Sequence, residues 1–297
     1  MNRRHLNLLR LAFVSMLTVA AAALDAAGFL GPAQPYPRTD DQRAWNIPFE
    51  PFRIVGPIHY VGTAELGSYL ITSDAGHILI DTGLEEQATQ LIASIERLGF
   101  KVSDIKVLLN SQAHFDHAAG FAELKKRSGA KMLASAKDAL MLEAGGNGDP
   151  AFGDKYLFPA VKVDGHIADG QVVAVGPLKL TAHLTPGHTK GTTTWEMTVR
   201  DQNRDLRVFF VGSTSIQPDV SGLNNPKYPE IRADLDRTYA TYKTFQPDIF
   251  LSQHAGYYGL ADKFAKLKAG ASPNPFIDPE GYKAQIARLE EDYKKVR

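Results

Sequence analysis

The chain has 297 residues, with 33 basic and 33 acidic side chains, and therefore a formal net charge of zero. This length is enough for one large hydrophobic core, and the balanced charge gives no basic patch of the kind that nucleic-acid-binding proteins use. The sequence contains no cysteine. Disulfides, thiolate metal ligands and cysteine nucleophiles are therefore excluded, and any metal site must use His, Asp, Glu or neutral oxygen ligands.

The first 27 residues have the pattern of a secretory signal peptide. Basic residues in Met1–Arg10 precede an apolar run of 14 residues, Leu11–Leu24, and small residues follow at two candidate cleavage sites, Ala21–Ala23 and Ala26–Gly28. The apolar run is short for a membrane span, although an uncleaved anchor is the alternative. We expect a periplasmic mature protein over residues 28–297 that has no membrane attachment.

The mature chain opens on Phe29–Phe52, which is rich in proline and polar residues and predicts an extended N-terminal arm. Trp45 and Phe49 in this arm either line a cleft or pack on the core, and we favour packing. Alternation of β-rich runs, turn residues and helical periodicity then predicts the next elements. These are strands Ile58–Gly62, Ser68–Thr72, His77–Asp81, Ile105–Leu109 and Lys131–Ala134, and helices Glu85–Leu98, Ala119–Arg127 and Ala136–Ala144.

A long loop, Gly145–Pro159, separates the two halves of the mature chain. A loop of this length is often functional, so Phe152, Tyr156 and Phe158 are candidates for substrate contact, and a plain surface excursion is the equal alternative. The second half again favours strands followed by helices. These are strands Val161–Val163, Gln171–Val175, Leu178–Leu184, Thr192–Val199, Arg207–Val211 and Asp248–Ser252, and helices Pro229–Thr244, Leu260–Ala269 and Pro279–Val296.

Strands followed by helices in both halves predict an α/β fold in which two β-sheets pack face to face with helices on the outside. No linker divides residues 28–297, so we expect a single domain, and nothing in the sequence predicts more than a monomer. Trp195 lies in the predicted strand Thr192–Val199, where a core position is the expected one.

Metal-binding side chains cluster directly after the predicted strand Ile105–Leu109. His114, Asp116 and His117 lie within four residues, at a strand-to-helix turn where side chains converge outside the carboxyl edge of a sheet. His188 and His254 each follow another predicted strand and each lie beside a glycine, where the backbone can turn sharply. Imidazole nitrogens and carboxylate oxygens are zinc ligands, so three strand ends that deliver them together predict a metal site.

The spacing of these residues resembles that of the metallo-β-lactamase superfamily, whose motif is His-x-His-x-Asp-His followed by a Gly-His and a late His. Four further motifs are similar to those of the subclass B3 metallo-β-lactamases, and the likeness runs from about Asn46 to the C-terminus. They are Pro51–Gly56, Gly76–Gly83, Thr185–Thr189 and Asn274–Tyr282. The resemblance implies the αββα sandwich of two mixed sheets that is known as the metallo-β-lactamase fold.

The resemblance also implies a ligand set for one or two Zn²⁺ ions. The first zinc position corresponds to Gln112, His114 and His188, and the second to Asp116, His117 and His254. Gln112 stands where the family pattern has histidine, and its carboxamide oxygen is a weaker zinc ligand than imidazole. We therefore expect the second position to fill first.

The activity that this family implies is hydrolysis of the β-lactam ring of penicillins, cephalosporins and carbapenems by metal-activated water, which confers antibiotic resistance. Asp116 would ligate the metal and also orient the water as a catalytic residue. Ser213 and Ser215 match positions that hold the substrate carboxylate, although an ordinary turn is equally compatible with them. Asp81 resembles the buried aspartate that supports the metal loop without touching the metal.

Two other classes of protein stay open at this point. A lactonase or thioesterase of the same fold would hydrolyse esters and not β-lactams, and the glutamine at position 112 keeps this alternative alive. A non-catalytic zinc-binding relative would bind metal without turnover, and the complete second ligand set and the two serines weigh against it.

Overall fold

The computed structural model describes residues 42, 44–201, 203–216 and 222–297. All described residues belong to one compact unit within Pro32–Arg297, which is called the second unit below. The predicted signal peptide and most of the predicted arm fall outside the described residues, so these predictions stay untested. None of the described helices is both long and apolar enough to cross a membrane.

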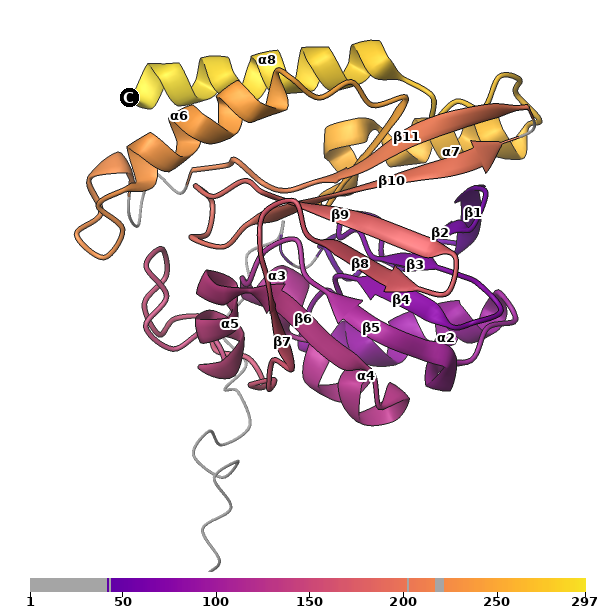
Figure 1. The fold of residues 1–297 in the computed structure, drawn as a ribbon, viewed down its shortest axis with the longest axis horizontal. Coiled ribbons are helices and arrows are strands. Elements are labelled where there is room, and N and C mark those ends of the chain that lie inside the picture. Colours follow the sequence, from indigo (N-terminus) through magenta and orange to yellow (C-terminus); the bar gives the residue numbers. More distant parts are fainter. Residues whose placement is uncertain (1–41, 43, 202, 217–221) are drawn as a thin grey trace, which may run out of the picture. The chain divides into compact units, whose positions relative to one another are not determined.

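Two β-sheets form the centre of the second unit (Figure 1). The first sheet has the strand order β1-β2-β3-β4-β5-β6-β7 and the second has the order β12-β11-β10-β9-β8. Strands of the first sheet are β1 (Phe52–Val55), β2 (Ile58–Tyr60), β3 (Tyr69–Ile71), β4 (His77–Ile80), β5 (Ile105–Leu109), β6 (Lys131–Ser135) and β7 (Gly165–Ile167). Strands of the second are β8 (Val172–Val175), β9 (Leu178–Leu184), β10 (Thr193–Asp201), β11 (Arg204–Val211) and β12 (Ile249–Ser252).

Helices lie outside the two sheets, as Figure 1 shows. The first sheet is followed by η1 (Glu85–Gln87), α2 (Ala88–Arg97), η2 (Val102–Asp104), α3 (Phe115–Ala118), α4 (Phe121–Ser128) and α5 (Ala136–Glu143). The second has η3 (Gly222–Asn224), α6 (Ile231–Tyr242), η4 (Ala255–Tyr258), α7 (Leu260–Lys268) and α8 (Pro279–Val296). The predicted αββα sandwich with mixed sheets is thereby confirmed.

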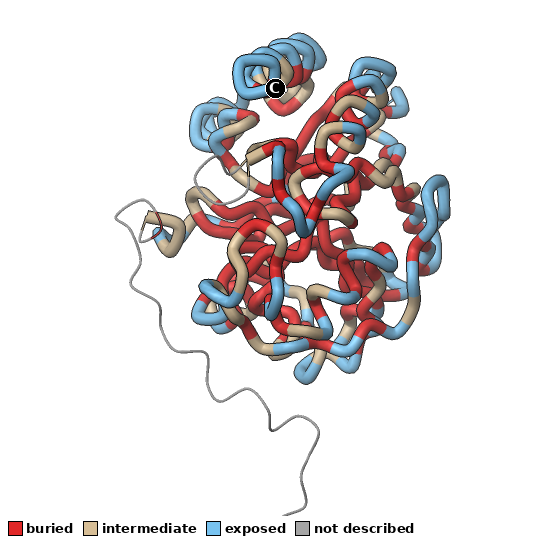
Figure 2. Tube along the Cα trace, turned by 90° about the vertical axis from the view of Figure 1, so that its left-hand side faces the viewer, coloured by how far each residue is buried: buried red, intermediate tan, exposed pale blue. Residues whose placement is uncertain are grey.

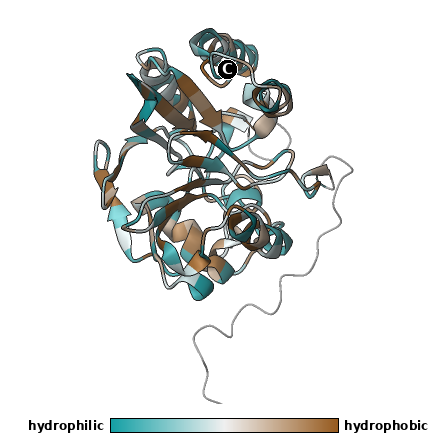
Figure 3. Ribbon diagram, turned by 90° about the vertical axis from the view of Figure 1, so that its right-hand side faces the viewer, coloured by the Kyte–Doolittle hydropathy of each residue, from teal (hydrophilic) through white to brown (hydrophobic). Residues whose placement is uncertain are grey.

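Strand β4 shows how both faces of the first sheet are buried in apolar layers. Ile78 and Ile80 face the core between the two sheets, whereas Leu79 points to the opposite side and joins the core under the helices. Because successive side chains of a strand point to opposite faces, an unbroken apolar run such as this is buried on both. Buried segments accordingly fill the interior of the tube in Figure 2, and hydrophobic segments run through the middle of the sandwich in Figure 3.

Most predicted elements match the structure to within a few residues, and one strand prediction is wrong. Val161–Val163 is not a strand, and the seventh strand is β7, four residues further on. Val161 and Val163 pack their side chains into the core below the helices, so their apolar pattern reflects burial without pairing. Strand β1 also went unpredicted, because it directly follows the proline-rich arm.

The topology directs several loops to one edge of the sandwich. Strands β4 and β5 are parallel in the first sheet, and β11 and β12 are parallel in the second. Strand β9 has the same direction as β11, since each is antiparallel to β10. The carboxyl ends of these strands carry the loops that hold every predicted metal ligand, which is where ligands bind in open α/β sheets.

Candidate metal centre

The turn after β5 is held in place by Asp81, at the end of β4. The Asp81 carboxylate accepts hydrogen bonds from the Ser111 backbone N–H at 2.7 Å and from the Ser111 hydroxyl at 2.6 Å. Asp81 itself has a positive φ of 57°, an uncommon conformation for a residue other than glycine, and is almost completely buried. Burial raises the pKa of Asp81 to about 6. These contacts suit the predicted supporting role of Asp81.

Asp116, His117 and His254, which correspond to the second zinc position, form one of two groups of metal-binding atoms. Asp116 Oδ2 lies 3.2 Å from His117 Nε2 and 3.5 Å from His254 Nε2. One ligand atom from each residue lies within 4.8 Å of the others. Burial raises the pKa of Asp116, but His117 and His254 more than offset this and hold it well below its usual range, so Asp116 is a carboxylate at neutral pH.

His117 provides a direct test of whether a cation fits this group. The residue is completely buried, and neither ring nitrogen has a hydrogen-bond partner of acceptable geometry within the described part of the chain. Buried polar atoms without a partner are costly and rare in native proteins. A cation between His117, Asp116 and His254 would satisfy the ring nitrogen that faces them, so this donor set fits a divalent metal.

His114 and His188, which correspond to the first zinc position, form the other group. His114 Nδ1 and His188 Nε2 face each other at 3.0 Å. The other nitrogen of His188, Nδ1, lies 2.7 Å from the Ser215 carbonyl oxygen, which can only accept, so the His188 proton is on Nδ1 and its lone pair is on Nε2. Burial lowers the pKa of His114 to about 4, and burial together with His114 lowers that of His188 to about 3. Both rings are therefore neutral at pH 7, as metal ligands must be.

Gln112 lies in the same turn and is almost completely buried. Its Oε1 atom accepts a hydrogen bond from the His114 backbone N–H at 3.3 Å. The carboxamide oxygen therefore already has a local partner inside the turn, where an imidazole would present a free lone pair. The first position consequently has two imidazoles that face each other and a third, weaker candidate ligand.

The low pKa values of His114 and His188 predict a pH dependence for the metal-free protein. Both values lie below the ordinary 6.5 of the unfolded chain, so the unfolded state binds more protons as the pH falls. The contribution of these two histidines to the free energy of unfolding should therefore be complete above pH 6.5 and fall as the pH drops towards 4. Urea unfolding of chelator-treated protein measures this, and the fall should be smaller in His188→Asn. His166→Asn, at an exposed histidine of β7, should keep the wild-type slope. An equal slope in all three proteins would contradict the assignment.

The backbone around His188 depends on a glycine. Gly187 has a φ of 141°, and a Cβ atom there would collide with the side chain of Leu235 on α6. A larger residue would be strained and would push the turn away from α6. Gly187 therefore allows the chain to leave β9 and bring His188 against His114.

Ser213 and Ser215 follow β11 and lie against this turn. Their hydroxyl oxygens are 3.0 Å apart, and the Ser215 hydroxyl also lies 3.1 Å from His188 Nδ1. The two serines therefore stand beside the His114–His188 pair, and Ser215 additionally orients His188 through its carbonyl oxygen. That second contact was not predicted, because a backbone carbonyl leaves no signal in the sequence.

Aromatic side chains border the two groups. Trp45 is partly buried against the core below the helices, and its ring lies edge-on to His254, with 5.7 Å between ring centroids. Phe152 meets His114 edge-on at 4.9 Å. Of the three aromatic residues in the loop Gly145–Pro159, Phe152 and Tyr156 pack beside the metal turn, whereas Phe158 is buried in the core and cannot contact a substrate.

Comparison with known proteins assigns the family. The model of the metallo-β-lactamase superfamily matches residues 68–199. A solved subclass B3 metallo-β-lactamase of Bradyrhizobium japonicum is 41% identical, with a TM-score of 0.80, and the match covers 85% of this chain and 95% of that one. The chain belongs to the metallo-β-lactamase superfamily.

Further relatives in this superfamily differ in activity. The metallo-β-lactamase of Legionella gormanii is 40% identical, with a TM-score of 0.82, over 84% of this chain and 95% of that one. A hydroxyacylglutathione hydrolase of Methylobacterium nodulans is 32% identical over 102 residues, which are 34% of this chain and 32% of that protein. The chain spans less than half the length of the curated relatives that it matches.

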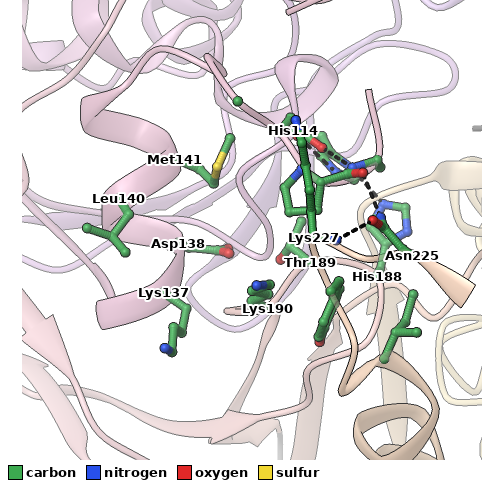
Figure 4. Close-up of a pocket in the computed structure, with 16 residues that line it drawn as sticks. His114, Lys137, Asp138, Leu140, Met141, His188, Thr189, Lys190, Asn225 and Lys227 are labelled. Carbon is green, nitrogen blue, oxygen red and sulfur yellow. Dashed lines mark hydrogen bonds and ion pairs between the residues drawn. The ribbon is translucent and has the colours of Figure 1, made fainter. Parts of the chain in front are cut away.

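A cavity of about 440 Å³ opens on the His114–His188 side of this superfamily member (Figure 4). Asp116, His117 and His254 do not line it. Its walls come from α5, the loop Gly145–Pro159, the His188 turn and the segment before α6. They include His114, His188, Asp149, Lys137, Lys190 and Lys227. Asp149 lies close to the predicted ligand His114, and the sequence did not indicate this, because Asp149 lies 32 residues beyond the metal motif in a glycine-rich loop.

Proposed function

We propose that this protein is a zinc-dependent β-lactamase of the subclass B3 kind, which opens the β-lactam ring by hydrolysis. The observation that carries the proposal is coverage. The β-lactamases of known structure match almost their entire length at about 40% identity, whereas the hydroxyacylglutathione hydrolases match about a third to a half of theirs. A match over 84–85% of the chain must extend beyond residues 68–199, into the part of the chain that carries Ser213 and His254.

Two groups of residues would hold the metal. Asp116, His117 and His254 would bind one zinc, and His114 and His188, with Gln112 as the third candidate, would bind another. Zinc bound there would supply a Lewis acid that activates water near neutral pH and polarises the lactam carbonyl. The neutral imidazoles of His114 and His188 and the ionised Asp116 are already in the protonation states that this requires.

Asp116 would also act on the attacking water. Its Oδ2 atom faces His117 and His254, which leaves Oδ1 to accept a hydrogen bond from that water. The low pKa of Asp116 keeps this oxygen an acceptor throughout the neutral range. The lactam nitrogen must gain a proton when its bond to the carbonyl carbon breaks, and the same water is the source of that proton.

Ser213 and Ser215 would bind the carboxylate that penicillins, cephalosporins and carbapenems carry. Ser213→Ala should raise KM about 10-fold with little change in kcat, because a hydrogen bond to a charged group contributes about 1.5–3 kcal/mol. Steady-state kinetics with benzylpenicillin measures this. Ser73→Ala is the control, since Ser73 caps the β3–β4 turn. An unchanged KM in Ser213→Ala would remove this serine from the substrate site.

The substrate class can be tested by measuring kcat/KM for each of the alternative substrates. The purified mature protein should have a far larger kcat/KM for a cephalosporin and a carbapenem than for S-lactoylglutathione or a simple lactone. The hydroxyacylglutathione hydrolase likeness favours the reverse order, and thioester hydrolysis is the second candidate for that reason. Thioester turnover without ring opening in fully metal-loaded protein would replace the β-lactamase proposal.

Export to the periplasm, a monomeric state and a role in antibiotic resistance belong to this proposal. Their support is the signal-like sequence of residues 1–27 and the activity named for the structural relatives. Mass spectrometry of protein recovered from the periplasm would give the cleavage site, which we expect near residue 27.

A further inference from the structure

Asp149 is buried in the loop between α5 and β7 and lies behind His114. Only 5% of the residue is exposed. Its Oδ2 atom lies 3.4 Å from His114 Nε2, the ring nitrogen on the side away from His188. Its Oδ1 atom accepts hydrogen bonds from the backbone N–H groups of Ala151 at 2.6 Å and Phe152 at 3.1 Å.

The loop is built to hold this carboxylate in place. The Gly153 N–H donates to the Asp149 carbonyl at 2.8 Å and closes a tight turn. Asn225, from the segment before α6, donates through Nδ2 to the Pro150 carbonyl at 2.6 Å. Asp149 is thus held in place by hydrogen bonds within its own loop, and Asn225 fixes that loop from the segment before α6.

The two nitrogens of His114 consequently have different surroundings. Nε2 faces a carboxylate, which favours a proton there, and the lone pair is then on Nδ1, which faces His188. The Ser215 carbonyl has the equivalent effect on His188 and leaves its lone pair on Nε2. The 3.0 Å contact between the two rings also fits a hydrogen bond, but a metal between them requires a lone pair on both facing nitrogens. Asp149 and the Ser215 carbonyl favour that arrangement, because each attracts the ring proton to the outer nitrogen.

We propose that Asp149 is a positioning residue that orients His114 as a ligand at the first zinc position, where Gln112 is a weak third ligand. The proposal rests on the metal site of the proposed function. Carboxylates that hold a ligating histidine typically affect metal affinity 10- to 100-fold, and the effect should matter most where the remaining ligand set is poor.

Asp149→Asn separates this role from simple packing. The variant keeps an oxygen for the Ala151 and Phe152 N–H groups, but its NH₂ group cannot accept from His114 Nε2. Calorimetric zinc titration should show about 10- to 100-fold weaker binding at the first position and unchanged binding at the second. The matched control is Asp154→Asn, which removes the same charge from the same loop. Asp154 accepts from the Gly148 N–H at 2.8 Å and is exposed, so its variant should bind zinc as the wild type does.

Gln112→His identifies the first position, because it should strengthen only that binding event. The Asp149→Asn change is therefore measured in both backgrounds, and the third imidazole should restore part of the lost affinity. In zinc-loaded wild type, the His114 Nε2 proton should give a downfield NMR signal that is protected from exchange, and Asp149→Asn should lose it. This signal tests the proposal even if the variant does not fold.

The possible failures are distinguishable. Equal first-position affinity in Asp149→Asn and wild type in both backgrounds, or an unprotected His114 proton, would overturn the role of Asp149 alone. Wild-type protein and Gln112→His that both fail to bind zinc would overturn the metal site, and the proposed function with it.

Discussion

Asp116→Asn should abolish zinc binding at the second position and lower the rate of β-lactam hydrolysis by more than about 100-fold. This loss exceeds the one expected for residues that only hold a metal ligand in place, which is about 10- to 100-fold. Asp116 is the only carboxylate in its group and lies within 3.5 Å of both histidines. The neutral carboxamide of Asn is a weaker ligand for zinc, and it also lacks the charge that accepts from the attacking water.

The measurements are zinc content by atomic emission and kcat/KM for a cephalosporin on the same sample. Asp164→Asn is the control, because it removes a carboxylate that pairs with Lys125 and belongs to neither group of metal ligands. This variant should keep the zinc content and the kcat/KM of the wild type. Retention of stoichiometric zinc and of hydrolysis by Asp116→Asn would exclude this residue as both a ligand and a catalytic group.

Trp195→Ala should destabilise the fold by about 3–5 kcal/mol, the usual cost of truncating a large buried aromatic residue. Trp195 is completely buried in β10 between the two sheets, as its core position in the sequence predicted. Its indole N–H donates to the Asn110 carbonyl at 2.9 Å, so it also ties the second sheet to the start of the metal turn.

Thermal unfolding followed by circular dichroism measures this effect, and a loss of this size corresponds to a fall in Tm of roughly 10 °C for a chain of this length. Trp195→Phe keeps most of the apolar contact and removes only the N–H, so it should lose much less stability. A Tm of Trp195→Ala within about 2 °C of the wild type would contradict the packing role, since such a shift corresponds to 1 kcal/mol or less.

Residues at strand ends are the part of the site that the sequence predicts well. His114, Asp116, His117, His188 and His254 each follow an apolar run, and parallel strands deliver their carboxyl ends to one edge. Local pattern and general topology rules are therefore sufficient to bring these five side chains together. The layer architecture follows from the same alternation of strands and helices.

Contacts made by the backbone and by loops are the part that could not be predicted. The Ser215 carbonyl that orients His188 exists at every residue of the chain and carries no sequence signal. Asp149 lies in a loop whose path is set by turns and by a hydrogen bond from Asn225, which lies 75 residues beyond its acceptor Pro150. The strand prediction for Val161–Val163 failed for a related reason, because side chains that are buried without strand pairing have the same apolar pattern as a strand.

Metal-dependent ring opening is the property that a zinc β-lactamase must show. Purified mature protein is assayed with a cephalosporin and a carbapenem before chelation, after chelation and after zinc is restored, and the zinc content of each sample is recorded. We predict hydrolysis that disappears with the metal and returns with it. It should already be substantial at about one zinc per chain, because the complete ligand set Asp116, His117 and His254 is expected to fill first. Activity that appears only at two zinc ions would contradict this order of filling. Absence of ring opening in fully metal-loaded protein would contradict the β-lactamase proposal itself.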